Sequence, residues 1–154
     1  MTAPNHALTG ALIGLTVANP LLALPAAFLS HFVLDVIPHY DVPGETHEQR
    51  MASKQFLIVQ IVLGAVLCFA LVVLLAVAQP KHWILAAFCA FIATTPDMLF
   101  IPRFVSVKKT GHDNLGTFWF WRFHNAIQWF QKPIGAIVEV IWFVSFGALL
   151  LARL

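Results

Sequence analysis

The sequence predicts an all-α membrane protein, a polytopic bundle of about five apolar helices, the first of them short, with an additional amphipathic helix at the membrane interface. Only 10% of the 154 residues are charged and 60% are hydrophobic, whereas soluble domains carry about 25% charged residues. Several apolar runs approach the ~20 residues that a spanning helix needs. Polar residues gather mainly in segments 41–54 and 103–132. We expect one membrane-embedded domain over residues 1–154.

The first two apolar segments, 7–18 and 21–37, predict a helical hairpin around an Asn-Pro turn at 19–20. Gly10 and Gly14 stand four residues apart in the first segment. Small residues at this spacing let helices approach closely in lipid. The first segment is too short for a hydrocarbon core of about 30 Å, so we expect a short span or a half-inserted helix.

Three further spans are predicted over residues 56–78, 83–101 and 134–152, which are long apolar runs. Segment 41–54 is predicted to be a water-exposed loop, because it is rich in charged residues and contains a Pro-Gly turn signal. Segment 117–131 mixes aromatic and polar residues. That mixture suits an amphipathic helix at the membrane interface.

The distribution of Lys and Arg predicts the orientation. If all five apolar segments cross the membrane, the segments 42–54 and 102–132 lie on the same side as the N-terminus. That side carries Arg50, Lys54, Arg103, Lys108, Lys109, Arg122 and Lys132. The opposite side carries Lys81 and Arg153. The rule therefore places the polar segments, including a predicted loop over 108–116, in the cytoplasm.

The end of the second apolar segment carries the strongest chemical signal, with two histidines and two aspartates within a dozen residues. His31 and Asp35 are four residues apart and share one face of a helix. Pro38 ends that helix, which allows His39 and Asp41 to fold back toward the same point. Imidazoles and carboxylates that converge at the end of an apolar helix are typical of a metal site.

The predicted topology brings further ionisable residues to the same membrane face. His6 begins the first helix, Asp97 is near the end of the fourth, and His124 is in the interfacial helix. We predict a centre for a divalent metal, with zinc as the expected metal and one or two ions. The predicted metal ligands are His6, His31, Asp35, His39, Asp97 and His124. The predicted catalytic residues are Asp41 and Glu139, as a base or as groups that orient a ligand.

Three alternatives remain open for this polar cluster. It is also compatible with a buried packing network in a structural membrane protein, with a metal-dependent lipid oxidase, and with a non-enzymatic metal or proton transporter. A transport path needs polar groups through the full depth of the membrane, and Gln60 is the one clearly polar side chain in segment 56–78. The net charge of +2 gives no case for a nucleic-acid partner.

The first part of the chain also carries a family pattern, in which an early histidine precedes a glycine-rich helix and a histidine and an aspartate follow on the second helix. The residues that carry it are His6, Gly10, Gly14, Ser30, His31, Asp35, Pro38 and His39. This pattern resembles the small membrane-bound metal-dependent hydrolase family. That family comprises inner-membrane hydrolases, some under LexA control, and is compared with zinc-dependent phospholipases C. The resemblance covers mainly residues 1–41.

The resemblance implies metal-assisted hydrolysis of a lipid ester or phosphoester in the inner membrane of a bacterium or archaeon. A metal-bound water is the expected nucleophile. The expected partners are membrane lipids and a lipid-like substrate that reaches the site sideways from the bilayer, past the aromatic interfacial helix.

Overall fold

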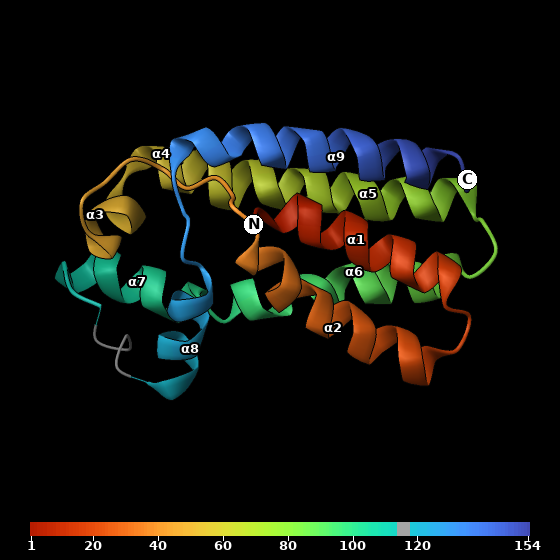
Figure 1. The fold of residues 1–154 in the computed structure, drawn as a ribbon, viewed down its shortest axis with the longest axis horizontal. Helices are drawn as coiled ribbons and strands as arrows, with labels where there is room; N and C mark the ends of the chain where they lie inside the picture. The colour runs from red at the N-terminus through yellow and green to blue at the C-terminus, as the bar shows by residue number, and fades with distance from the viewer. Residues whose placement is uncertain (114–117) are drawn as a thin grey trace.

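The computed structural model describes residues 1–113 and 118–154, and helices make up most of them (Figure 1). The α-helices are α1 (Ala3–Thr16), α2 (Pro20–Val36), α3 (His47–Ala52), α4 (Lys54–Phe56), α5 (Gly64–Ala78), α6 (Trp83–Met98), α7 (Ile101–Thr110), α8 (Trp119–Ile127) and α9 (Ala136–Leu151). A π-helical segment, η1 (Leu57–Leu63), joins α4 to α5, and a 3₁₀ turn, η2 (Pro133–Gly135), leads into α9. No β-strand occurs in the described residues, so the all-α prediction is confirmed for them. Residues 114–117, part of the predicted loop 108–116, lie outside the described residues.

Three helical stretches are long and apolar enough to cross a membrane, namely Lys54–Ala78, Trp83–Thr110 and Pro133–Leu151. The apolar helix α2 is shorter. Large apolar side chains point outward from the long helices; Phe69 on α5 is 70% exposed and Val144 on α9 is 62% exposed. So much exposed apolar surface suits a lipid environment and not water. By length and composition, three of the predicted spans can therefore cross a membrane, while a bundle of about five spanning helices stays a prediction.

The first helix, expected to be a short or half-inserted span, lies inside the bundle. α1 packs against α6, α2, α9 and α5 (Figure 1). The approach to α6 is close, because a Cβ atom added at Gly10 would lie 2.3 Å from the carbonyl oxygen of Cys89. At Gly14 the added atom would lie 2.5 Å from the Cα of Ala86. The predicted role of the two glycines in close helix approach is therefore confirmed.

The hairpin between α1 and α2 follows its sequence signals. The side chain of Asn19 accepts a hydrogen bond from the backbone of the first turn of α2. The helix ends at Val36, two residues before Pro38, whose ring cannot continue it. Ala23 and Ala27 are fully buried in a small-residue core shared with α6.

The polar segment 41–54, predicted to be a loop, contains α3. This helix begins with a capping box: the side chain of Thr46 accepts a hydrogen bond from the backbone nitrogen of Gln49 at 3.2 Å, and the side chain of Gln49 accepts one from the backbone nitrogen of Thr46 at 3.3 Å. Both residues are visible in the sequence as a helix-start signature. The charged composition of the segment indicated a loop, whereas this capping box starts a helix within it.

The chain from Arg103 onward was predicted to be a polar segment after the fourth span, with a loop over 108–116, and its first part is helical. α7 reaches Thr110, so that the fourth apolar helix continues well beyond the predicted end. Arg103 is 1% exposed, because its guanidinium lies over the rings of Phe100 and Trp121 and pairs with Asp113. A charge neutralised inside the fold does not end a helix, and sequence alone does not show the partner.

The helix predicted to lie at the membrane interface corresponds to α8, which is shorter than the predicted 117–131. It is amphipathic, since Trp121 and His124 are buried while Trp119 and Phe123 are exposed. The buried face packs against α2. The aromatic residues therefore position a histidine, in addition to presenting an apolar surface.

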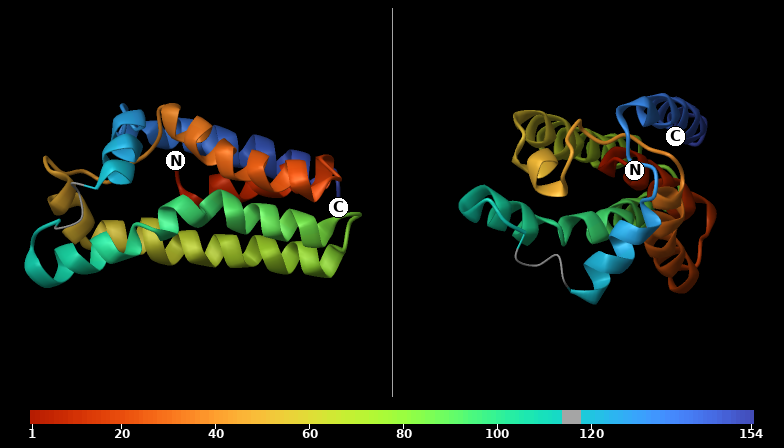
Figure 2. Two further views of the ribbon diagram at one scale, coloured as in Figure 1. Left: turned by 90° about the horizontal axis from the view of Figure 1, so that it is seen from below. Right: turned by 60° about the vertical axis from the view of Figure 1, so that its left-hand side comes forward.

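The two segments that follow α2 and α8 are joined backbone to backbone. The nitrogen of His39 donates to the carbonyl oxygen of Phe130 at 3.2 Å, and the nitrogen of Lys132 donates to the carbonyl oxygen of His39 at 3.3 Å. In Figures 1 and 2, α3, α7 and α8 gather at the end of the bundle where α1 begins and α2 ends. The turns at 17–19 and 79–82 lie at the other end. The first of these ends is where the polar residues collect.

Candidate metal centre

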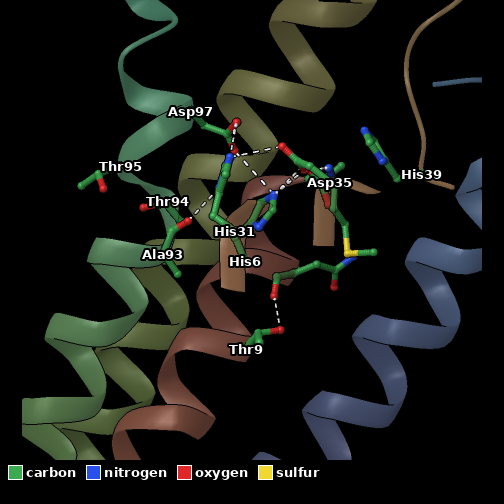
Figure 3. Close-up of polar contacts among 12 residues, drawn as sticks. His6, Thr9, His31, Asp35, His39, Ala93, Thr94, Thr95 and Asp97 are labelled. Carbon is green, nitrogen blue, oxygen red and sulfur yellow. Dashed lines mark hydrogen bonds and ion pairs between the residues drawn. The ribbon is translucent and has the colours of Figure 1, made fainter. Parts of the chain in front are cut away.

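The polar residues meet where four helices come together. His6 is in the first half of α1, Asp35 in the last turn of α2, Asp97 in the last turn of α6 and His124 in α8. His31 lies one turn deeper than Asp35 on α2. Figure 3 shows His6, His31, Asp35 and Asp97 turned toward one another. The topology predicted this convergence, and the structure confirms that these residues lie together.

Four of these residues form a group that can hold a metal ion. His31, Asp35, Asp97 and His124 each offer one ligand atom, and these atoms all lie within 4.8 Å of one another. The Nε2 atoms of His31 and His124 are 3.0 Å apart, and Oδ2 of Asp35 lies 3.2 and 3.1 Å from them. Ligands at ~2.0–2.2 Å from a tetrahedral ion are roughly 3.3–3.6 Å from each other. The spacing is therefore close to that of a coordination sphere.

The orientation of His31 suits a metal ligand. Its Nδ1 lies 2.9 Å from the carbonyl oxygen of Ala93 on α6. A carbonyl oxygen only accepts, so Nδ1 carries a proton, and the neutral form of the ring would direct the lone pair of Nε2 into the centre. A second hydrogen bond of this kind fixes the ring and tautomer of most metal-binding histidines.

His6 approaches the same carboxylates from another side. Its Nε2 lies 3.1 Å from Oδ1 of Asp35 and 3.9 Å from Oδ2 of Asp97. The carbonyl oxygen of Met1 is 3.0 Å from the same nitrogen, and the amino group of Met1 contacts Oδ1 of Asp35. The rings of His6 and His31 are stacked, with centroids 4.1 Å apart.

The surroundings of Asp35 show why a cation is favoured here. Asp35 is 1% exposed, and Gln128 donates to its Oδ2 at 2.9 Å. Asp97 adds a second carboxylate, whose side chain is 31% exposed. Two carboxylates inside an apolar bundle need positive charge nearby. The amino group of Met1 balances one of the two negative charges, and a cation among the imidazoles would balance the other.

Gln128 was not among the predicted site residues. It stands four residues after His124, which is the spacing that places two side chains on one helical face. That spacing was the signal that could have found it. The aromatic neighbours of His124 also belong to the site, since Phe32 and Phe100 lie against its ring.

The structure does not bring His39 into the group of four. In Figure 3 its ring lies apart from Asp35. Nδ1 of His39 donates to the carbonyl oxygen of Ile37 at 2.7 Å, and no described residue partners its buried Nε2. Burial, with a smaller contribution from the positive N-terminal amino group, lowers the pKa of His39 to about 4. The ring is therefore neutral at pH 7, and ligation by His39 stays a prediction.

The two predicted catalytic carboxylates have different surroundings. Asp41 accepts hydrogen bonds from the backbone nitrogen of Val42 at 2.7 Å and from Arg50 at 3.0 Å. Burial raises the pKa of Asp41 despite the nearby Arg50. Glu139 instead accepts from the backbone nitrogen and the hydroxyl of Thr2, at 2.8 and 2.6 Å. Glu139 thus ties the start of α1 to α9, and its catalytic role stays a prediction.

A cavity of about 140 Å³ opens beside this group of four residues. Its polar lining includes Asp97, Gln128, His39 and Asp41, and its apolar lining includes Phe56, Ile61, Phe100 and Phe104. The cavity therefore has one polar wall next to the centre and one apolar wall on the side of η1 and α7. An amphiphilic molecule matches this division.

No family model, curated protein or solved structure matches this chain. The resemblance to membrane-bound metal-dependent hydrolases therefore stays a prediction from the residues that carry it.

Proposed function

We propose that this protein is an integral membrane hydrolase that depends on a divalent metal and acts on a lipid ester or phosphoester. The observation that carries the proposal is the group His31, Asp35, Asp97 and His124, whose ligand atoms lie within 4.8 Å of one another beside an amphiphilic cavity. Buried ionisable residues in membrane helices are usually functional. Two imidazoles and two carboxylates form a ligand set that suits zinc.

The chain's own residues divide the chemical work. His31, His124, Asp35 and Asp97 would hold the cation, which supplies Lewis-acid chemistry by polarising an ester or phosphoryl oxygen and acidifying a water molecule. Gln128 orients Asp35 through its hydrogen bond. Asp41 lines the cavity, and its raised pKa suits a group that accepts a proton and returns it.

The cavity supports a lipid-like substrate. Phe56 and Phe104 stack with ring centroids 5.9 Å apart on its apolar wall, where an acyl chain would lie. The head group would then face Asp97. The exposed Trp119 and Phe123 of α8 provide an apolar surface at the same end of the bundle. Together these features favour access from the bilayer.

We further propose that α1 and α2 cross the membrane with the three long helices, giving five crossings, and that the site faces the cytoplasm. The excess of Lys and Arg in the segments 42–54 and 102–132 supports this orientation. Single cysteines at Glu45 and at Lys81, in a background in which Cys68 and Cys89 are replaced by alanine, test it. In intact cells an impermeant thiol reagent should label the cysteine at 81 and spare the one at 45.

The function is tested with purified protein in vesicles of mixed phospholipids and neutral glycerides, loaded with Zn²⁺ or Mn²⁺. We expect metal-dependent release of a lipid product that is detected by mass spectrometry and lost in Asp35→Asn. Bound metal with no hydrolysis of any lipid, together with metal uptake into the vesicles, would favour a transporter instead. No bound metal would favour a packing network.

A further inference from the structure

We infer that the centre holds two divalent cations, bridged by the carboxylates of both Asp35 and Asp97, with His6 as a ligand of the second cation. This inference rests on the proposed metal centre and goes beyond it. The four-residue group does not include His6. His6 contacts one oxygen of each carboxylate, and His31 contacts the other.

In each aspartate, one carboxylate oxygen faces His31 and the other faces His6. Oδ2 of Asp35 lies 3.2 Å from Nε2 of His31, and Oδ1 of the same carboxylate lies 3.1 Å from Nε2 of His6. Asp97 repeats the division, with Oδ1 3.8 Å from His31 and Oδ2 3.9 Å from His6. A carboxylate whose two oxygens serve different imidazoles is placed as a bridge between two ions.

We call the proposed cation position beside His31 and His124 the first position, and the one beside His6 the second position. Around Nε2 of His6 stand three oxygen atoms, from Asp35, Asp97 and the Met1 carbonyl, at 3.1, 3.9 and 3.0 Å. A carbonyl oxygen only accepts, so Nε2 of His6 carries the ring proton in this arrangement. A cation would take the place of that proton, which would move to the unpartnered Nδ1, and would lie at roughly 2.0–2.2 Å from its ligands. The amino group of Met1 contacts Oδ1 of Asp35 and is the cation that a metal would displace there.

The spacing of the two positions follows from the stacked rings. The rings of His6 and His31 are 4.1 Å apart and tilted by 23°, and both Nε2 atoms face the same pair of carboxylates. Two nearly parallel imidazoles at this distance direct their lone pairs to points about as far apart as the rings. Cations in two-metal hydrolytic sites are about 3.5–4 Å apart.

The two positions differ in the ligand atoms that they offer, and the presence of two cations bears on the kind of substrate. The first offers two nitrogens and two carboxylate oxygens, while the second offers one nitrogen and three oxygens. Zinc suits the first, and the oxygen-rich second position suits zinc or the harder Mn²⁺. A pair of cations holds both the attacking and the leaving oxygen of a phosphoryl group. The inference therefore favours a lipid phosphoester over a carboxylic ester.

The test measures metal stoichiometry on detergent-purified full-length protein, first stripped with chelator and then titrated with Zn²⁺. We expect two equivalents per chain for the wild type and one for His6→Gln. The matched control is His82→Gln, which removes a histidine in the turn before α6, at the opposite end of the bundle. It should keep two equivalents.

A second measurement needs no variant. The wild type loaded with Mn²⁺ should give the electron paramagnetic resonance spectrum of an exchange-coupled pair. One equivalent in both the wild type and His6→Gln, or a spectrum of isolated Mn²⁺ only, would overturn the second cation and leave the proposed function in place. No metal bound by the wild type would overturn both.

Discussion

Two buried polar groups lie on opposite sides of the start of α1, and they are built differently. On one side Asn5 donates through its amide to the Glu139 carboxylate and, at 3.1 Å, to the Glu139 carbonyl oxygen, while Thr2 donates twice to the same carboxylate. On the other side the neighbouring His6 faces Asp35 and Asp97. The first group consists of a carboxylate surrounded by neutral donors. The second gathers two carboxylates around imidazole nitrogens.

The difference separates a packing network from a ligand set. A buried carboxylate with a full set of donors stabilises the fold without any ion. The Glu139 group meets this description. In the other group Nδ1 of His31 donates its proton to the carbonyl oxygen of Ala93, and Nε2 faces the carboxylate of Asp35. In the neutral ring Nε2 would offer a lone pair beside the two carboxylates, and a cation satisfies such an arrangement.

The largest effect is expected from Asp35→Asn. The amide keeps the shape of the side chain but removes the negative charge that faces both His6 and His31. We expect Zn²⁺ affinity, measured by competition with a coloured chelator, to fall at least about 100-fold. Glu139→Gln is the matched control on the other side of α1 and should change the affinity little. An equal loss of Zn²⁺ affinity in the two variants would contradict the distinction between the two polar groups.

His39 adds a pH test at the edge of the metal centre. Its pKa is about 4 in the folded protein against 6.5 as the ordinary value, so the unfolded chain binds more protons between these values. Folding stability from this residue is therefore lost as the pH falls from about 6.5 to about 4, by up to roughly 3 kcal/mol. Thermal unfolding in detergent at pH 7 and pH 4.5 should show a smaller acid loss for His39→Gln than for the wild type. An unchanged acid loss would contradict the burial of a neutral ring.

Gly10→Ala tests whether the two polar groups depend on the close packing of α1 against α6. The new Cβ would lie 2.3 Å from the carbonyl oxygen of Cys89, so α1 and α6 must separate. We expect a loss of roughly 1–3 kcal/mol in unfolding free energy and weaker metal binding, since His6 is on α1 and Asp97 on α6. Gly147→Ala on α9 adds its Cβ where no atom lies within 4 Å and should lower neither stability nor metal affinity.

The smallest effect is expected from Glu139→Gln itself. The glutamine amide still accepts one hydrogen bond but brings its own donors toward Thr2 and Asn5. We expect a loss of about 1–2 kcal/mol in unfolding free energy, measured by thermal unfolding, with metal content retained. A fully stable variant that had lost its metal would place Glu139 in the ligand set instead.

Sequence reasoning captured the parts of the site that follow from local geometry and from order along the chain. His31 and Asp35 share a face because they are four residues apart, and Pro38 ends their helix. His6, Asp97 and His124 could be placed near them because alternating spans return to the same membrane face. The close contact of α1 with α6 was visible in Gly10 and Gly14.

The remaining features depend on partners that are distant in sequence. Glu139 looked like an isolated acid until α1 was found inside the bundle, against α9, with Asn5 beside the carboxylate. Arg103 looked like the start of a polar segment outside the bundle, because Trp121 and Asp113, which neutralise and cover it, are distant in the sequence. His39 was placed with the ligands because the turn after Pro38 has no fixed direction in the sequence. The structure turns its ring toward the carbonyl oxygen of Ile37 instead.

Anomalous diffraction from crystals of the Zn²⁺-loaded protein, recorded on both sides of the zinc absorption edge, tests the central claim most directly. We predict strong anomalous density between the Nε2 atoms of His31 and His124 and the carboxylate of Asp35, and none beside Glu139. Loaded crystals without density at the His31–His124 position would contradict the metal centre and would make both polar groups packing networks.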